Sequence, residues 1–233
     1  MMKKKVLKIL PLIAIILTLC IGKTHAQRLL IGAKGGINYG SIATNTTYYE
    51  LKSGSSSGLY FEFIPGSFPL SLALETNYLT YGAEEIEEAL IFDEAEILNN
   101  YLFNQYYKST NISFTAIDVP MLIKLNLHLK AGVSASLYGG SSFTYILNAN
   151  AIQEYEMIID QTTVSNFDIT ERVAESAYTG IVGLGGIFDI DPLALTFDVR
   201  YRIGLTDLNN YYGKADFKSH SVHVMLGLAY IIE

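Results

Sequence analysis

The chain has 233 residues, of which half are hydrophobic and 17% are charged, and its mean hydropathy is +0.26. These values exclude an intrinsically disordered chain, which would combine low hydrophobicity with high charge. Lys and Arg number 16 against 23 Asp and Glu, and the net charge is −7. Because a nucleic-acid-binding surface would be basic, no nucleic-acid partner is expected. The 17 Tyr, 11 Phe and 19 Gly without any Trp are typical of all-β proteins.

Residues 1–26 have the pattern of a secretory signal peptide. Four lysines within the first eight residues precede an apolar run over 9–21, and Thr24-His25-Ala26 offers a small-residue cleavage site before Gln27. We expect export, cleavage after Ala26, and one domain over 27–233. A membrane-anchor helix is the alternative, although the run is shorter than the about 20 residues that a bilayer requires and Pro11 interrupts it.

The only cysteine, Cys20, lies within this first segment. A lipoprotein would need a small residue directly before that cysteine, where Leu19 stands. The mature chain is therefore expected to contain neither a disulfide nor a thiol nucleophile.

From residue 27 on, apolar and polar residues alternate over eight segments rich in Tyr, Phe, Val, Ile and Thr, which predicts β-strands. The segments are 28–40, 58–65, 70–82, 111–127, 131–147, 178–190, 194–205 and 219–232. The connections between them are alternately long and short, as in transmembrane β-barrels, which have short periplasmic turns and long extracellular loops. The sequence therefore predicts an all-β fold, an eight-stranded antiparallel up-and-down transmembrane β-barrel.

The segment 194–205 indicates which side of a strand would face lipid. Its odd positions, among them Phe197 and Tyr201, are large and apolar, and its even positions are small or charged. A shift of the register by one residue would place Asp198, Arg200 and Arg202 in hydrocarbon, at about 2–4 kcal/mol for each arginine near the midplane. The register is therefore strongly fixed, with outer-membrane lipid as the expected partner of the apolar face.

The same alternation places eight charged side chains on the inner face of the barrel, four cations and four anions. They are Lys34, Lys124, Arg200, Arg202, Glu62, Glu75, Asp118 and Asp198. Eight strands enclose an interior that side chains can fill, and buried charges need partners. We therefore predict a lumen charge network that acts as a mutually paired polar plug. A narrow porin or a gated ion path through these charges is the alternative.

Most of the acidic residues lie in two long connections. The first contains Glu84, Glu85, Glu87, Glu88, Asp93, Glu94 and Glu96. The second contains Glu154, Glu156, Asp160, Asp168, Glu171 and Glu175. Apolar residues between the glutamates predict a short amphipathic helix over 83–98. One interpretation is a docking surface for a basic partner, such as another envelope or secretion protein, or for divalent cations; the other is a solvated loop without a calcium-loop motif.

Motifs for catalysis or cofactor binding are weak. Residues 54–58 match G-x-S-x-G around Ser56, but they are expected in a Gly/Ser-rich loop rather than at a strand-to-helix turn. His220 and His223 would lie on opposite faces of a strand and could not share a metal ion. Three further glycines lie within one predicted strand, where they would allow curvature and close packing: Gly183, Gly185 and Gly186. We therefore expect no enzyme activity, no cofactor and no metal.

Three of these strands resemble the PorT-like family of bacterial outer-membrane β-barrel proteins, often called porin-family proteins of Gram-negative bacteria. Segment 117–124 (IDVPMLIK) is similar to the Ile-Pro-Leu-Leu-Leu-Lys strand of that family, and segment 198–205 (DVRYRIGL) is similar to its Arg-Tyr…Gly-Leu strand. The glycine-rich segment 178–190 is similar as well. The resemblance covers the chain from Gln27 and implies an outer-membrane location and, as for the founding members, a part in protein secretion. It assigns no functional residue.

The leading interpretation is a non-enzymatic outer-membrane barrel with a structural or secretion-assisting role. A soluble exported lipocalin-like barrel that binds an apolar ligand is an alternative, but its interior would be apolar and its outer face polar, the reverse of segment 194–205. A barrel enzyme with its site in the outer loops is a third interpretation, and no set of spaced residues supports it.

Overall fold

Nine strands and one 3₁₀ helix, η1 (Thr170–Arg172), make up the regular structure of the described residues. The computed structural model describes residues 27–43, 50–66, 68–86, 105–157, 161–208 and 218–233. The strands are β1 Arg28–Ala43, β2 Glu50–Ile64, β3 Leu70–Ile86, β4 Gln105–Lys130, β5 Val133–Met157, β6 Gln161–Asp168, β7 Ser176–Ile190, β8 Leu193–Gly204 and β9 Lys218–Ile232. The predicted signal peptide over 1–26 lies outside the described residues.

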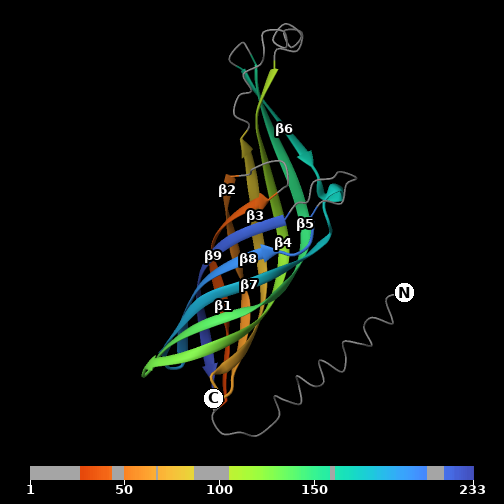
Figure 1. Ribbon diagram of the computed structural model, residues 1–233. Coiled ribbons are helices and arrows are strands. Elements are labelled where there is room, and N and C mark those ends of the chain that lie inside the picture. The colour runs from red at the N-terminus through yellow and green to blue at the C-terminus, as the bar shows by residue number, and fades with distance from the viewer. Residues whose placement is uncertain (1–26, 44–49, 67, 87–104, 158–160, 209–217) are drawn as a thin grey trace, which may run out of the picture.

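Eight of these strands form a closed barrel in which every neighbouring pair is antiparallel (Figure 1). The order is β4-β3-β2-β1-β9-β8-β7-β5, and the pairing of β4 with β5 closes the ring. The predicted eight-stranded antiparallel barrel is therefore confirmed. Closure gives every barrel strand a hydrogen-bonded neighbour on both sides and leaves no open sheet edge along the described barrel wall.

Side chains alternate between the interior and the outer surface, because successive residues of a strand point to opposite faces. In β8, Phe197 and Tyr201 are exposed on the outside, while Asp198, Arg200 and Arg202 are buried inside, as the sequence pattern predicts. Exposed large apolar side chains come from all eight barrel strands and make the outer surface an apolar belt. Five exposed tyrosines form a girdle at one border of this belt: Tyr39, Tyr78, Tyr145, Tyr178 and Tyr201.

The two ends of the barrel differ. At one end, here called the turn end, residues 65–69, 131–132 and 191–192 join consecutive strands, and the C-terminus lies at the same end (Figure 1). Gly132 has a φ of +76°, a conformation that glycine adopts readily, and its carbonyl oxygen accepts a hydrogen bond from the N–H of Asp189. The opposite end, the loop end, carries the long connections. No helix in the described ranges is long and apolar enough to span a membrane.

Several strands reach further toward the loop end than the sequence predicts. β2 begins at Glu50 rather than at residue 58, so the G-x-S-x-G sequence over 54–58, expected in a loop, lies inside a strand. β4 begins at Gln105 and β5 ends at Met157. The ladders of neighbouring strands stabilise these segments, although Gly, Ser and Asn have a low intrinsic preference for strands.

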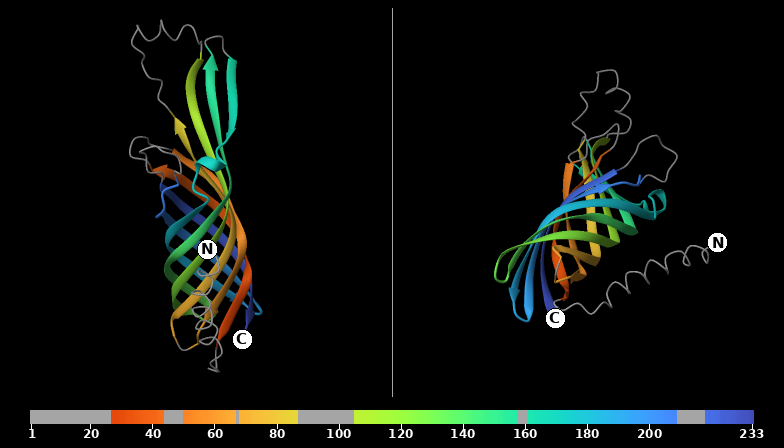
Figure 2. Two further views of the ribbon diagram at one scale, coloured as in Figure 1. Left: turned by 90° about the vertical axis from the view of Figure 1, so that its right-hand side faces the viewer. Right: turned by 60° about the horizontal axis from the view of Figure 1, so that its bottom comes forward.

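The second long connection is also more ordered than expected. It contains the end of β5, the additional strand β6 and η1, and β6 pairs with β5. Together β4, β5 and β6 form a three-stranded arm that projects beyond the barrel (Figure 2). The helix predicted over 83–98 is wrong for residues 83–86, which are in β3 and pair with β4; residues 87–98 lie outside the described residues.

Candidate functional site

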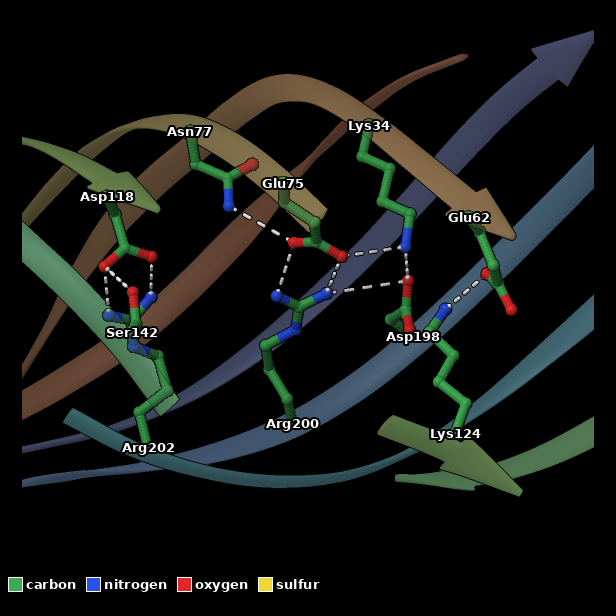
Figure 3. Close-up of polar contacts among 10 residues, drawn as sticks. All are labelled: Lys34, Glu62, Glu75, Asn77, Asp118, Lys124, Ser142, Asp198, Arg200 and Arg202. Atoms are coloured by element: carbon green, nitrogen blue, oxygen red, sulfur yellow. Dashed lines mark hydrogen bonds and ion pairs between the residues drawn. The ribbon is translucent and has the colours of Figure 1, made fainter. Parts of the chain in front are cut away.

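The eight charged residues of the lumen charge network all lie inside the barrel, and none is more than 5% exposed. They come from five strands: Lys34 from β1, Glu62 from β2, Glu75 from β3, Asp118 and Lys124 from β4, and Asp198, Arg200 and Arg202 from β8. Each one is a partner in at least one ion pair (Figure 3). The structure thus brings all eight together in one compartment, with equal numbers of positive and negative charges.

The central part of the network bridges opposite walls of the barrel. Arg200 donates two hydrogen bonds to the carboxylate of Glu75, from Nη1 to Oε2 at 2.7 Å and from Nη2 to Oε1 at 3.0 Å. Their strands, β8 and β3, are four places apart in the ring of eight, which is half the circumference. Lys34 joins both walls, because its Nζ lies 3.2 Å from Glu75 Oε1 and 2.5 Å from Asp198 Oδ2.

Nearer the turn end, Lys124 Nζ lies 2.8 Å from Glu62 Oε2. The second oxygen of Glu62 accepts a hydrogen bond of 2.7 Å from the hydroxyl of Ser71, which in turn accepts one of 2.8 Å from the amide of Asn126. This group therefore links β2, β3 and β4, and a neutral donor satisfies the carboxylate oxygen that the lysine does not reach.

Nearer the loop end, Arg202 and Asp118 form a bidentate pair, with distances of 2.6 and 2.7 Å. The hydroxyls of Ser142 and Thr144, both on β5, also donate to Asp118. Bidentate, charge-assisted hydrogen bonds are among the strongest polar contacts in proteins. The carboxylate of Asp118 is fully buried and accepts four hydrogen bonds, two from Arg202 and two from the hydroxyls. These hydrogen bonds replace much of the hydration that the carboxylate loses on burial.

Sequence reasoning missed several neutral partners of the network. The sequence analysis singled out neither Ser142 and Thr144 nor Asn77, which donates to Glu75 at 3.2 Å. Two buried tyrosines were missed as well. Lys34 Nζ lies 4.3 Å from the ring centroid of Tyr60, and Tyr138 lies beside both Lys124 and Arg200. Their inward position in the alternation is a signal that could have identified them.

Gly183 makes room for Tyr138. A methyl group at Gly183 would lie 2.6 Å from the Tyr138 ring, which is itself buried beside Arg200. We expect Gly183→Ala to lower the free energy of unfolding by about 1–3 kcal/mol, the usual effect of overpacking. Gly139→Ala is the matched control, because the added methyl group would make only an ordinary contact of 3.5 Å. Urea titration of both variants in lipid vesicles measures the difference, and equal losses would contradict the prediction.

Apolar residues lie on both sides of the charges. One buried cluster is near the turn end: Leu30, Tyr60, Ile64, Ile187, Ala194, Ala229 and Ile231. A second is near the loop end: Ile42, Ala83, Ile112, Phe114, Ile146, Ala149, Ala151, Ala177 and Leu208. A third, smaller cluster consists of Ala73, Leu122, Tyr138 and Ile181. An open hollow of about 750 Å³ lies at the turn end, next to Arg28 and His128. Beside Arg202 a cavity measures only about 20 Å³, which is room for about one water molecule.

The acidic residues of the first long connection are only partly described. Glu84 is half-buried in β3 and pairs in register with Glu50 and with Asn111. Glu85 is also in β3. The remaining predicted docking residues lie outside the described residues: Glu87, Glu88, Asp93, Glu94 and Glu96. The docking surface over this set therefore stays a prediction.

The second acidic set is partly engaged in local contacts. Glu175 Oε1 accepts a hydrogen bond of 2.8 Å from the hydroxyl of Tyr145. Hydrogen bonds from the side chain and the backbone N–H of Thr170 lower the pKa of Asp168 from its ordinary value. Among the described residues, no group of three or more His, Cys, Asp or Glu side chains could hold a metal ion.

The two histidines of β9 are placed apart, as their spacing predicts. His220 stacks on Tyr201, and its Nδ1 lies 3.2 Å from the tyrosine hydroxyl. His223 is 1% exposed, and its Nε2 lies 3.0 Å from the hydroxyl of Ser221. They do not form a shared site.

A closed barrel with an apolar belt, a tyrosine girdle and charges confined to the interior is an outer-membrane β-barrel protein. The turn end is then periplasmic and the loop end extracellular. The soluble lipocalin-like alternative is wrong, because its polar and apolar faces would be reversed. Residues 24–210 match the family model described as "Outer membrane protein beta-barrel domain", and the chain belongs to this family. The predicted location in the outer membrane is thereby confirmed.

Several solved structures are similar to this chain. A major outer membrane protein from Thermus thermophilus is 14% identical, with 89% of this chain and 100% of that chain covered and a TM-score of 0.47. Neisserial surface protein A is 12% identical, with coverages of 86% and 96% and a TM-score of 0.43. The outer membrane protease OmpT from Escherichia coli is 10% identical, with coverages of 90% and 99% and a TM-score of 0.44. No curated protein sequence matches the chain.

Proposed function

We propose that this protein is a non-conducting, non-enzymatic barrel of the outer membrane whose lumen charge network acts as a structural plug. The observation that carries the proposal is the Arg200–Glu75 pair, which joins opposite walls through two hydrogen bonds. Lys34, Asp198 and the apolar clusters fill the interior around it. An ion crossing the lumen would have to displace a desolvated bridge in which each charge faces an opposite charge.

Recordings in planar lipid bilayers test the plug. We expect no steady conductance from the wild-type protein, because the lumen is filled. The double variant Glu75→Ala, Arg200→Ala removes one charge of each sign and leaves the Lys34–Asp198, Lys124–Glu62 and Arg202–Asp118 pairs in place. It should therefore fold and show measurable ion flow. Steady wild-type conductance of nanosiemens size would refute the plug and favour the narrow porin.

The absence of enzyme activity is part of the same proposal. Ser56 of the G-x-S-x-G sequence lies on β2, is 3% exposed and faces the interior of the barrel. A substrate would have to enter the packed barrel to reach it. Residual lipase or protease activity of the purified protein in micelles that is lost in Ser56→Ala would overturn this part.

The resemblance to the PorT-like family supports a role in protein secretion. Under this proposal, the extracellular acidic segments are the surface that meets a basic envelope or secretion protein. Deletion of the gene should then remove specific proteins from the surface and secreted fractions, and re-expression of the gene should restore them. Unchanged fractions after deletion would leave a purely structural role and contradict assistance in secretion.

A further inference from the structure

Strand β6 forms the outer edge of the extracellular arm. It pairs with β5 over its whole length, from Met157↔Gln161 to Asn150↔Asp168, and no other described strand pairs with it (Figure 2). Unlike the eight barrel strands, β6 therefore has one side on which no ladder partner is described. Such an edge is a template for another strand, because its backbone N–H and C=O groups keep their hydrogen-bonding capacity.

The hydrogen bonds next to β6 show which residues present these groups. The N–H of Ile169 donates to the carbonyl oxygen of Ala149 at 2.9 Å, in the same register as the β5–β6 ladder. In an antiparallel pair, hydrogen-bonded and non-hydrogen-bonded residue pairs alternate. Phe167 and Ser165 therefore direct their backbone groups toward β5, whereas Asn166 and Val164 direct theirs toward the outer edge.

Within the described residues, the edge lacks three features that proteins use to prevent strand addition, namely lysine, proline and a β-bulge. β6 has the sequence QTTVSNFD, which contains neither Lys nor Pro, and its ladder with β5 has no bulge. Val164 is 58% exposed and Phe167 is 47% exposed, and the two lie on opposite faces of the arm. A strand added here would meet apolar contacts as well as backbone groups.

The negative charge around the edge of β6 favours a positively charged partner. Residues 148–177 contain six acidic residues and one basic residue, Arg172. Glu154 lies directly opposite Val164 in the ladder, and Asp168 ends the strand on the same face as Glu154 and Val164. Phe167 and Ser165 lie on the other face. A complementary strand would therefore place cations on the face of Glu154 and Asp168 and apolar side chains on the face of Phe167.

We infer that the free edge of β6 binds an extended basic segment of a partner protein, which joins the arm as a fourth strand. The segment alternates Lys or Arg with apolar residues. Backbone hydrogen bonds to Val164 and Asn166 hold it in place, and Glu154 and Asp168 favour its basic character. This inference rests on the proposed acidic docking surface, and it names the part of that surface and the class of ligand.

The test uses an eight-residue fluorescent peptide of alternating lysine and valine and the full-length protein in detergent micelles. Asn166→Pro removes an edge N–H without removing a hydrogen bond to β5, and Asn166→Ala is the matched control that keeps the N–H. Fluorescence anisotropy should show binding of the peptide to the wild type and to Asn166→Ala. Asn166→Pro should bind about tenfold more weakly, as the loss of about one backbone hydrogen bond predicts. Circular dichroism verifies that both variants fold.

Two further peptides separate strand addition from simple charge attraction. A peptide of the same sequence in which the backbone nitrogens of the two central lysines are methylated keeps its charge. It should bind about tenfold more weakly to the wild type, because the lysines lie opposite Val164 and Asn166 and their N–H groups are the ones that form the ladder. Equal binding of both lysine peptides, or of the two Asn166 variants, would overturn the edge site and leave the acidic docking surface standing. No preference for the lysine peptide over one of alternating glutamate and valine would overturn both.

Discussion

Arg202→Met should lower the free energy of unfolding by about 3–5 kcal/mol, the range found when one partner of a buried ion pair is removed. The guanidinium of Arg202 supplies two of the four hydrogen bonds to Asp118, whose side chain is fully buried. Without it, the hydroxyls of Ser142 and Thr144 alone face the carboxylate. Urea titration in lipid vesicles, followed by circular dichroism, measures the loss.

The control for this prediction removes both charges. In the double variant Asp118→Leu, Arg202→Met no charge is left unpaired, and replacement of a buried pair by apolar residues is often neutral or stabilising. We expect the double variant to be more stable than Arg202→Met alone. If the single and double variants lost the same stability, packing of the arginine side chain rather than its charge would explain the effect.

Leu226→Arg tests the apolar belt and should lower the free energy of unfolding by about 2–4 kcal/mol, as for arginine on the lipid face near the bilayer midplane. Leu226 is 66% exposed and is the central residue of the outward-facing row of β9, which runs from His220 to Ile232. An arginine there would carry its charge into hydrocarbon. Unfolding in lipid vesicles and the efficiency of insertion both report the effect.

Leu51→Arg is the matched control, because Leu51 is 70% exposed and lies on β2 beyond Ser53, the partner of the girdle residue Tyr39. It is therefore outside the belt, where the expected loss is only about 0–1 kcal/mol. Equal losses in Leu226→Arg and Leu51→Arg would show that the belt does not contact lipid, and the membrane orientation derived from the burial pattern would then be wrong.

The barrel could be predicted from the sequence because its strands obey a strict period of two. In β8, Phe197 and Tyr201 can face only lipid, and Arg200 and Arg202 only the interior, so one strand already fixes which face is which. The same rule identified all eight charges of the lumen. No comparable rule predicts which of them pair, since that depends on how the register of each strand staggers around the ring.

The arm could not be predicted, because its residues do not keep the period-two alternation of apolar and polar side chains that marks the barrel strands. Asn148, Asn150 and the sequence QTTVSNFD of β6 read as a polar loop, and only the ladder supplied by β4 and β5 makes them strands. For the same reason the Gly/Ser-rich start of β2 was assigned to a loop. Its neighbours β1 and β3 determine its conformation, and that information is distant in sequence.

The ion pairs of the lumen charge network also bear on how the barrel inserts into the membrane. Lys34 near the start of the barrel meets Asp198 near its end, 164 positions later, and Glu75 meets Arg200 across 125 positions. A nascent sheet that lacks β8 would keep the Lys34–Glu75 contact but would expose it to acyl chains without Asp198 and Arg200. We therefore expect insertion and ring closure to be coupled, because the strands that complete the barrel also complete these charge pairs.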